Sequence, residues 1–451
     1  MQFARAYVPF VRQIMDWHRF SQGGYGVMAD PYLSADIVTK HTIDVAQLQR
    51  AIQLLLSRNE VLRTQFVSGE GAMLYQVSLD ADSPLFRLRR FRGSSTDGLT
   101  AMMQENIAVP IRECALFKAC LLEQGTTSHI RLYVHQLIAD PRSLDMLKWE
   151  LVALYRSTIN TAEKPSAQQY IIYKNHRLFE QHTADYAFVR SLLLPISRHM
   201  FTPEALPVAA TLTPTLRRLS AGTYYQLKPE PANSYRSAIP IISARILTEN
   251  LRLHRTRLLG VLLIAFARVC RANGLQKRLI GVTYNEGYSP QVSQTVGNYV
   301  GESFVDTDRL LDEGDDVSAL EPLQHHLFKL YKHAIFNYNL YNIDESVLYQ
   351  HCVGFVNYTE SDNDLPYSVD APCFDPITAI DFDLEPAFCC YQDAIGICWR
   401  FNKSTFTDQQ IVSIDALFRA EVSRLIRLVE SSIGRNTNPA GQVVWGVEQG
   451  A

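Results

Sequence analysis

The sequence predicts an α/β protein with more than one lobe, and three observations support this prediction. The chain has 451 residues, which is longer than most single domains. Residues 129–151 read as a strand, a tight turn and a helix. Residues 258–284 read as an apolar helix, an Asn-Gly turn and a strand. Strand and helix therefore follow one another in both halves of the chain, as α/β folds require.

The segment from His129 to Leu151 is the one around which the chain is organised. Its first part alternates with the period of two that is expected of a strand with distinct faces. Asp140 and Pro141 end the strand, because proline fixes φ, donates no amide hydrogen and disfavours helix at its predecessor. Ser143 is the expected N-cap of the helix that follows. The apolar strand positions are Ile130, Leu132 and Val134, and the helix stripe is Leu144, Leu147, Leu151 and Leu154.

This segment resembles the core motif of the condensation domains of nonribosomal peptide synthetases. That motif consists of two adjacent histidines, three residues, Asp and Gly. Here it reads His135-Gln136-Leu137-Ile138-Ala139-Asp140-Pro141. The first His and the Asp match. Gln136 stands where the family keeps its catalytic histidine, and Pro141 stands where it keeps the glycine.

Other segments extend the resemblance over roughly residues 40–430. Residues 57–66, SRNEVLRTQF, resemble the family's second motif, with Asn59 in place of His. Residues 296–300, VGNYV, resemble its Gly-x-Phe-Val-Asn motif, and residues 10–17 correspond only distantly to its first motif. The resemblance implies two lobes, each similar to chloramphenicol acetyltransferase, that form a V-shaped pseudo-dimer with a tunnel between them.

The domain boundaries follow from this resemblance and from proline usage. Residues 1–195 are expected to form the N-terminal lobe and residues 241–430 the C-terminal lobe. Residues 196–240 are expected to be a crossover linker, because prolines from 195 to 240 interrupt any long helix. Residues 431–451 are rich in Gly, Asn and Pro and are expected to be a tail or linker. Within the lobes, Asp44 with Gln47 and Thr407 with Gln410 predict capping boxes, and Thr248 predicts a further helix start.

Gln136 decides what chemistry the motif can perform. A base that accepts the proton of an attacking amine needs a pKa near neutrality, which histidine has. Glutamine accepts hydrogen bonds but takes no proton near neutral pH, so it can at most orient the amine. His135 is expected to face the opposite side of the strand and to brace the motif as a buried histidine. We therefore expect no catalytic residue in the degenerate motif His135, Gln136, Asp140 and Pro141.

Asp140 and Pro141 predict structural roles. A carboxylate at a buried turn is costly unless it is paired, and the resemblance implies a pairing with an arginine. Arg63 and Arg278 are the candidates. Glycine at position 141 would allow positive φ and close approach of a ligand, whereas proline allows neither. The acceptor side of the expected tunnel is therefore predicted to be narrowed.

Two functional interpretations follow. In the favoured one, the chain is a condensation-like domain that no longer forms peptide bonds and instead recruits a tailoring oxygenase or hydroxylase to a carrier-bound aminoacyl group. In the alternative, it is an active acyltransferase that joins a carrier-bound acyl group to an amine or alcohol with a non-standard site. Both imply peptidyl or acyl carrier proteins as partners. No cofactor is expected to bind directly, other than the phosphopantetheine arm of the carrier.

The composition excludes several other classes. The net charge of −3 gives no reason to expect nucleic acid or an anionic membrane as a partner. No apolar run is long enough to span a bilayer, and the N-terminus lacks the apolar core of a signal peptide, so the cytoplasm is the expected compartment. The eight cysteines form no C-x-x-C pair and are expected to be reduced and buried. No metal site is expected from His325, His326 and His333.

Overall fold

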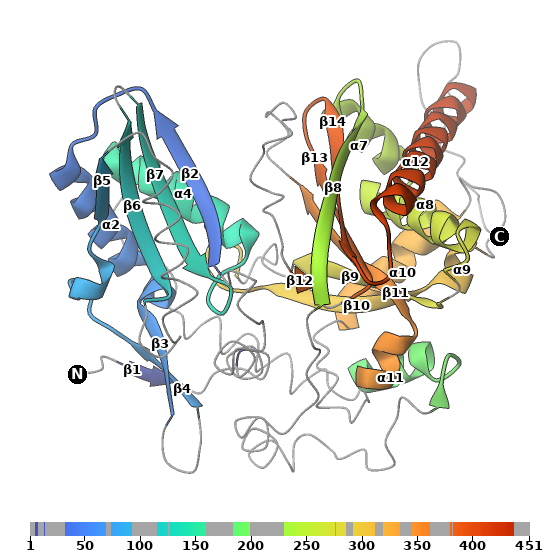
Figure 1. Ribbon diagram of the computed structural model, residues 1–451, viewed down its shortest axis with the longest axis horizontal. Helices are drawn as coiled ribbons and strands as arrows, with labels where there is room; N and C mark the ends of the chain where they lie inside the picture. Colours follow the sequence, from blue (N-terminus) through green and yellow to red (C-terminus); the bar gives the residue numbers. More distant parts are fainter. Residues whose placement is uncertain are drawn as a thin grey trace, which may run out of the picture.

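Two lobes lie side by side in the structure, a computed structural model (Figure 1). Each lobe contains a β-sheet with helices packed on it, so the predicted α/β class and its two-lobed arrangement are confirmed. The structure describes residues 5–7, 13, 32–68, 74–92, 115–124, 127–158, 184–198, 230–275, 277–285, 292–311, 319–333, 345–360, 379–380 and 382–436.

The first lobe is built on a four-stranded sheet with the order β2-β7-β6-β5. The central strand β7 runs antiparallel to both β2 and β6, and β5 runs parallel to β6. A second, smaller sheet is formed by three strands from the same part of the sequence, in the order β1-β4-β3. The strands are β1 (Arg5–Tyr7), β2 (Tyr32–Thr39), β3 (Thr64–Ser68), β4 (Leu74–Ser78), β5 (Arg89–Arg92), β6 (Phe117–Gln124) and β7 (Thr127–His135).

Two helices, α2 (Val45–Arg58) and α4 (Pro141–Tyr155), supply apolar side chains to the core of the first lobe. The short 3-10 helices η2 (Glu60–Arg63) and η4 (Pro84–Phe86) complete the lobe. Asp44 is the N-cap of α2, as predicted, and its carboxylate accepts the amide of Gln47 at 3.0 Å. The carboxamide of Gln47 donates to the carbonyl of Tyr155 at 2.7 Å, so it joins α2 to α4.

The second lobe is built on a seven-stranded sheet with the order β10-β9-β11-β13-β14-β8-β12. Strand β11 runs parallel to its neighbours β9 and β13, and the other pairs are antiparallel. The strands are β8 (Glu230–Pro240), β9 (Leu279–Asn285), β10 (Val300–Asp306), β11 (Cys352–Glu360), β12 (Ala379–Ile380), β13 (Leu384–Cys390) and β14 (Ala394–Asn402).

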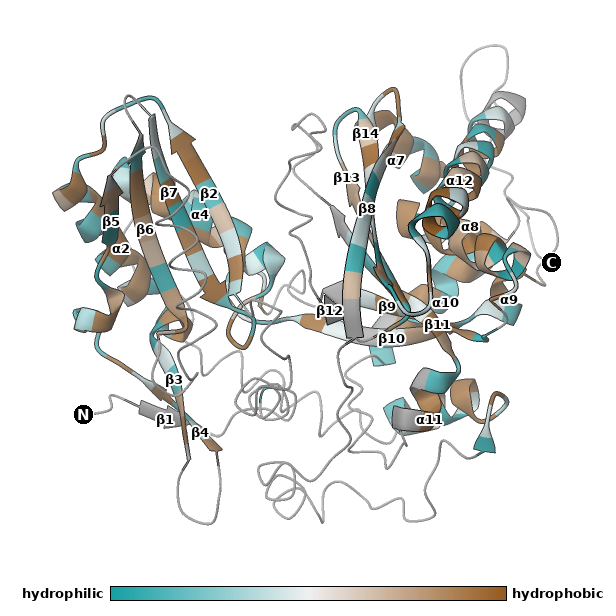
Figure 2. Cartoon of the chain, viewed as in Figure 1, coloured by the Kyte–Doolittle hydropathy of each residue, from teal (hydrophilic) through white to brown (hydrophobic). Residues whose placement is uncertain are grey.

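Helix α8 lies at the centre of the second lobe. It is apolar around most of its circumference, and twelve of its residues are buried (Figure 2). A helix that is hydrophobic on all sides must be enclosed, and α12 covers it. Its C-terminal turn ends at Gly274, whose φ of 74° suits glycine, as predicted. The helices are α7 (Ala244–Leu253), α8 (Leu258–Ala272), α9 (Thr307–Leu311), α10 (Leu320–His333), α11 (Glu345–Gln350) and α12 (Asp408–Asn436).

Two predicted helix starts in this lobe have different outcomes. Thr407 and Gln410 form the predicted capping box of α12: the amide of Gln410 donates to the Thr407 hydroxyl at 3.3 Å, and the amide of Thr407 donates to the Gln410 carboxamide at 2.8 Å. The prediction for Thr248 is wrong, because α7 begins four residues earlier at Ala244. Ser243 has extended backbone there and its hydroxyl accepts from the amide of Ile246, so it caps the helix.

The predicted linker boundaries need correction at both ends. Residues 230–240 form β8, which pairs with β14 along nine residues and is therefore an interior strand of the second sheet. Residues 184–193 form a helix, and Val189, Leu192 and Leu193 of this helix are buried in the core of the second lobe. The predicted tail begins too early, because α12 continues to Asn436. The proline content indicated roughly where the crossover lies. It did not indicate that the segments at both of its ends belong to the second lobe.

Six cysteines lie in the described part of the chain, and all six are buried free thiols, as predicted. Burial raises the pKa of Cys120 to about 11 and that of Cys352 to about 12. Cys114 and Cys373 lie outside the described residues. Among the helices that the structure describes, none is long and apolar enough to cross a membrane.

Candidate functional site

The motif lies where β7 passes into α4. The strand ends at His135, residues 136–138 form a turn, and the helix begins at Pro141. From Leu132 to Asp140 every residue is buried except Gln136, which is partly exposed. The residue that replaces the family's histidine is thus the one position of this stretch that a ligand can reach.

His135 is enclosed in the first lobe, as predicted. Its side chain is 1% exposed, and its Nδ1 accepts the amide of Leu137 at 3.0 Å. The ring of Tyr32 meets it edge to face at a centroid distance of 4.9 Å. Burial, and to a smaller degree the charge of Lys118, lowers the pKa of His135 to about 3. A histidine with this environment is neutral at physiological pH and braces the turn, so it cannot serve as the missing base.

Asp140 caps α4 and also reaches the second lobe. One carboxylate oxygen accepts the amide of Ser143 at 2.7 Å, and the other accepts the amide of Tyr299 at 3.1 Å. The predicted N-cap, Ser143, is therefore wrong by three residues. Proline at the first helical position is favourable because the amide it lacks would have had no partner within the helix, so Pro141 reinforces this helix start.

The contacts of Asp140, Arg63 and Arg278 that the structure describes differ from the predicted pairing. Arg63 donates from Nε to the carbonyl of Leu56 at 3.0 Å and from Nη1 to the carbonyl of Leu79, so it fastens η2 to its surroundings. Arg278 lies at the start of β9 and binds Asp306 at 2.7 Å and Asp308 at 3.0 Å. The partners that the structure describes for the Asp140 carboxylate are the backbone amides of Ser143 and Tyr299. Residue spacing in the sequence does not indicate such backbone partners.

Residues 292–299, between β9 and β10 of the second lobe, pack directly against the motif. The chain leading into β10 lies beside the end of β7 (Figure 1). Asn298 donates from Nδ2 to the carbonyl of Gln136 at 2.7 Å, and Arg142 donates to the carbonyl of Ser293. Val296 is buried among the core side chains of the first lobe. This segment contains the VGNYV motif, so the two motifs meet in space.

Two further motif segments support the same turn. Gln13, the described residue of the distantly matching first motif, donates to the carbonyl of Leu137 at 3.1 Å. In the second motif, Arg58 forms an ion pair with Glu150 of α4, and Asn59 donates to the same carboxylate at 3.2 Å. Asn59 therefore does the structural work of joining α2 to α4. Residues 169–176, which match a further motif of the family poorly, lie outside the described residues.

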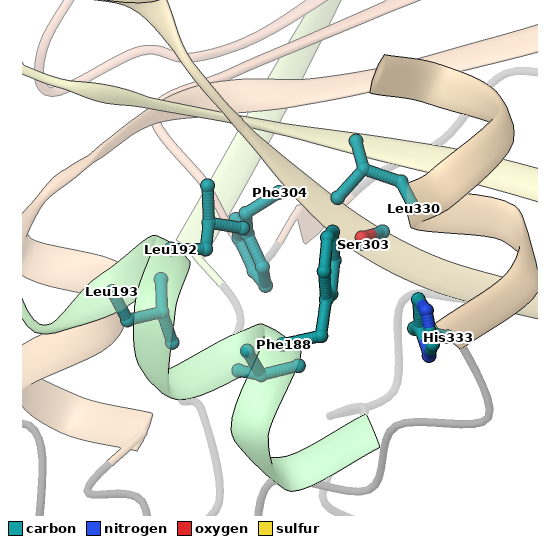
Figure 3. A pocket seen from close by; sticks show the side chains of 8 residues that line it. Phe188, Leu192, Leu193, Ser303, Phe304, Leu330 and His333 are labelled. Atoms are coloured by element: carbon teal, nitrogen blue, oxygen red, sulfur yellow. The ribbon is translucent and has the colours of Figure 1, made fainter. Parts of the chain in front are cut away.

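A histidine that is not enclosed in the motif, His333, lies at the end of α10 in the second lobe. Its Nδ1 lies 2.8 Å from Asp185, and Phe188 stacks on its ring at 4.7 Å. It lines a small, partly open and mostly apolar pocket together with Ser303 (Figure 3). Ser303 is five residues along the chain from Asn298, which corresponds to roughly 16 Å of extended strand. The imidazole is thus part of a separate, second-lobe pocket.

Other chemistry at the site is limited by its composition. No group of three or more His, Cys, Asp or Glu side chains within the described ranges is arranged to hold a metal ion. The groups that the structure brings together around Gln136 are a carboxamide from Asn298, the capping carboxylate of Asp140 and backbone amides. They can orient a ligand by hydrogen bonding, and none of them accepts a proton as histidine would.

The fold of the chain is similar to that of solved condensation-type domains. A condensation domain described as mediating chain release from the enacyloxin polyketide synthase superposes with a TM-score of 0.66 at 14% identity, covering 94% of this chain and 84% of that chain. The X-domain in the complex of X-domain and OxyB from teicoplanin biosynthesis superposes with a TM-score of 0.65 at 19% identity, covering 96% and 95%.

Sequence comparison gives the family. Residues 32–186 match the family model of the condensation domain. Tyrocidine synthase 3 of Brevibacillus parabrevis is 31% identical over 121 residues, which is 26% of this chain and 2% of that protein. This part of the chain is therefore similar to the condensation domains of nonribosomal peptide synthetases. The aligned stretch spans only a small fraction of this much longer relative.

Proposed function

We propose that this condensation-like domain does not form peptide bonds and acts as a platform that holds a carrier-bound aminoacyl group and recruits a tailoring oxygenase or hydroxylase to it. The observation that carries the proposal is the environment of the motif. The reachable residue is Gln136, which takes no proton, and the remaining imidazole, His135, is buried with its Nδ1 occupied.

The retained architecture supports a binding role for the site. The turn is fixed from the first lobe by Gln13 and from the second lobe by Asn298. Carboxamides such as those of Gln136 and Asn298 can both donate and accept hydrogen bonds, which suits the amide groups of a phosphopantetheine arm supplied by a carrier protein. The structural likeness to an X-domain solved in complex with OxyB supports an enzyme as the second partner.

The catalytic part of the proposal is tested by measuring product formation. Carrier proteins loaded with donor and acceptor groups are mixed with the domain, and the condensed product is measured by mass spectrometry. We expect no turnover above background with the natural chain or with Gln136→Ala. Turnover that Gln136→Ala abolishes, while the exposed control Gln53→Ala leaves it intact, would contradict the platform proposal.

Gln136→His is the complementary experiment. A general base raises the rate of such reactions roughly 10²–10⁴-fold. If the rest of the site is intact, the Gln136→His variant is therefore expected to show measurable turnover. The recruitment part is tested separately, by titrating tailoring enzymes of the same pathway against the isolated domain. Absence of any partner that binds in the micromolar range would count against recruitment without bearing on catalysis.

The alternative function is an acyltransferase that works by positioning alone. The observation that favours it is the multiple anchoring of the Gln136 turn, because well-held reactants can gain several orders of magnitude in rate without a base. It predicts condensed product from the natural chain. It also predicts that loss of the Gln136 carboxamide reduces the rate, which is the opposite of the result expected above.

A further inference from the structure

Ser143 has a buried hydroxyl group that its own helix does not use. The residue is the third of α4 and its side chain is fully buried. A serine at a helix start usually caps the helix, but Asp140 already caps α4 by accepting the amide of Ser143. The hydrogen-bond partner of the Ser143 hydroxyl therefore lies outside α4.

The hydroxyl binds the backbone of one residue in the other lobe twice. It donates to the carbonyl of Gly297 at 2.7 Å and accepts the amide of Gly297 at 3.1 Å. Both groups of Gly297 belong to irregular backbone between β9 and β10, where no strand partner is described for them. A buried amide or carbonyl without a hydrogen-bond partner lowers the stability of a fold. The Ser143 hydroxyl therefore stabilises the second lobe by binding both groups of Gly297.

The residues on either side of Gly297 show what this contact holds in place. Val296 is buried in the core of the first lobe, Asn298 binds the carbonyl of Gln136, and Tyr299 binds Asp140. Only Asn298 and Gln136 of this group are partly exposed. The double hydrogen bond to Gly297 is thus next in sequence to Asn298, which meets Gln136 at the partly exposed junction of the two lobes.

We propose that Ser143 is a positioning residue of the candidate site: it fixes the backbone of residues 296–299 against α4 and thereby holds Asn298 beside Gln136. The first lobe contributes the turn, and the second lobe contributes the residue that orients it. The proposal concerns the register between the lobes and stands whether or not the domain is catalytic.

Hydrogen exchange measured by mass spectrometry on the full chain tests this. In Ser143→Ala we expect exchange in residues 292–300 to rise at least tenfold, with residues 144–155 of α4 unchanged because Asp140 still caps the helix. Ser143→Thr keeps the hydroxyl and is expected to restore protection. Ser413→Ala is the matched control, since Ser413 lies on an exposed helical face and its hydroxyl bonds to Gln409 of the same helix.

Two results would overturn the proposal. Unchanged exchange in residues 292–300 would show that Ser143 holds nothing there. An equal rise throughout α4 would show that its role is local to the helix. Asn298→Ala covers the case in which Ser143→Ala does not fold: it is expected to increase exchange at the turn 136–138 and to leave the amide of Gly297 protected.

A second readout separates positioning from general destabilisation, and it rests on the proposed function. The affinities of an aminoacyl-loaded carrier and of the same carrier without its aminoacyl group are compared. Ser143→Ala is expected to lower the ratio of the two affinities at least threefold and to leave binding of the unloaded carrier unchanged. An equal loss for both carriers contradicts positioning, and no preference for the loaded carrier in the natural chain contradicts the proposed function alone.

Discussion

At the scale of single residues, His135 makes the stability of the protein depend on pH. Its pKa is about 3 in the folded protein and near 6.5 in the unfolded chain, so between these values only the unfolded chain binds the proton. The contribution is complete above about pH 6.5 and is lost as the pH falls, by about 1.4 kcal/mol per pH unit.

Urea unfolding at pH 7 and pH 5 measures this loss. The natural chain is expected to lose about 2 kcal/mol of unfolding free energy from His135 over this interval. His135→Gln, which cannot be protonated, is expected to be less stable at pH 7 but to lose correspondingly less on acidification. Gln53→Ala, at an exposed position that carries no ionisable group, provides the control and is expected to keep the pH dependence of the natural chain. Equal slopes for all three proteins would contradict the assignment.

The sequence predicted the burial of His135, but strand alternation does not apply to Gln136, which lies in the turn after β7. The sequence did not predict the two backbone amides that the structure shows on the Asp140 carboxylate. A carboxylate at a buried turn indicates that a hydrogen-bond donor must be nearby, but it does not indicate which residue supplies that donor. Arg63 and Arg278 were chosen for their charge, whereas the donors are the amides of Ser143 and Tyr299. Backbone amides are present at every non-proline residue and leave no sequence signal.

At the scale of elements, the start of α4 does more than an ordinary helix start. Asp44 caps α2 at the surface and binds Gln47. Asp140 caps α4 and also satisfies the buried amide of Tyr299. Substitution of each by alanine therefore removes a similar cap, but only Asp140→Ala also leaves an amide of the other lobe without its acceptor.

Chemical denaturation of the two alanine variants measures the difference. Asp44→Ala is expected to cost about 1 kcal/mol, as lost caps usually do. Asp140→Ala is expected to cost about 2–4 kcal/mol, because an unsatisfied buried amide adds about 1–3 kcal/mol. Asp140→Asn keeps oxygen acceptor capacity and is expected to fall between them. Equal costs for Asp44→Ala and Asp140→Ala would mean that the Tyr299 contact contributes nothing.

Capping boxes and helix ends were predicted well where the signal is contained in four consecutive residues, as for Thr407 with Gln410 and for Gly274. Thr248 failed because Ser243 offers the same chemistry one turn earlier. Strand β8 was not predicted. It contains two prolines and lies in a proline-rich region, yet both prolines are at its ends, where the missing amide costs little.

At the scale of the whole molecule, the lobes share a core residue. Val296 belongs to the second lobe by sequence and to the first-lobe core by burial. Val296→Ala is therefore expected to speed hydrogen exchange in β7 and α4 of the first lobe. Val282→Ala, at an equally buried position of β9, is the matched control and is expected to affect only the second lobe. Confinement of both effects to the second lobe would show that the lobes are energetically independent.

The two-lobed architecture came from the resemblance, because strand and helix periodicity is the same in either lobe and says nothing of how they face each other. The contacts that join the lobes come from residues 143 and 296–299, whose side chains and backbone are ordinary in the sequence. Such long-range hydrogen bonds depend on the folded positions of segments more than 150 residues apart.

The helix at residues 184–193 and strand β8 both build the second lobe, although they stand on opposite sides of the crossover. This matters for the design of chimeric synthetases. A second lobe that is transferred from residue 196 onward would lack the helix at residues 184–193, which packs on its hydrophobic core. A second lobe that is transferred from residue 241 onward would also lack β8, an interior strand of its sheet. An exchange that respects the folded units would take residues 184–436 as a single cassette.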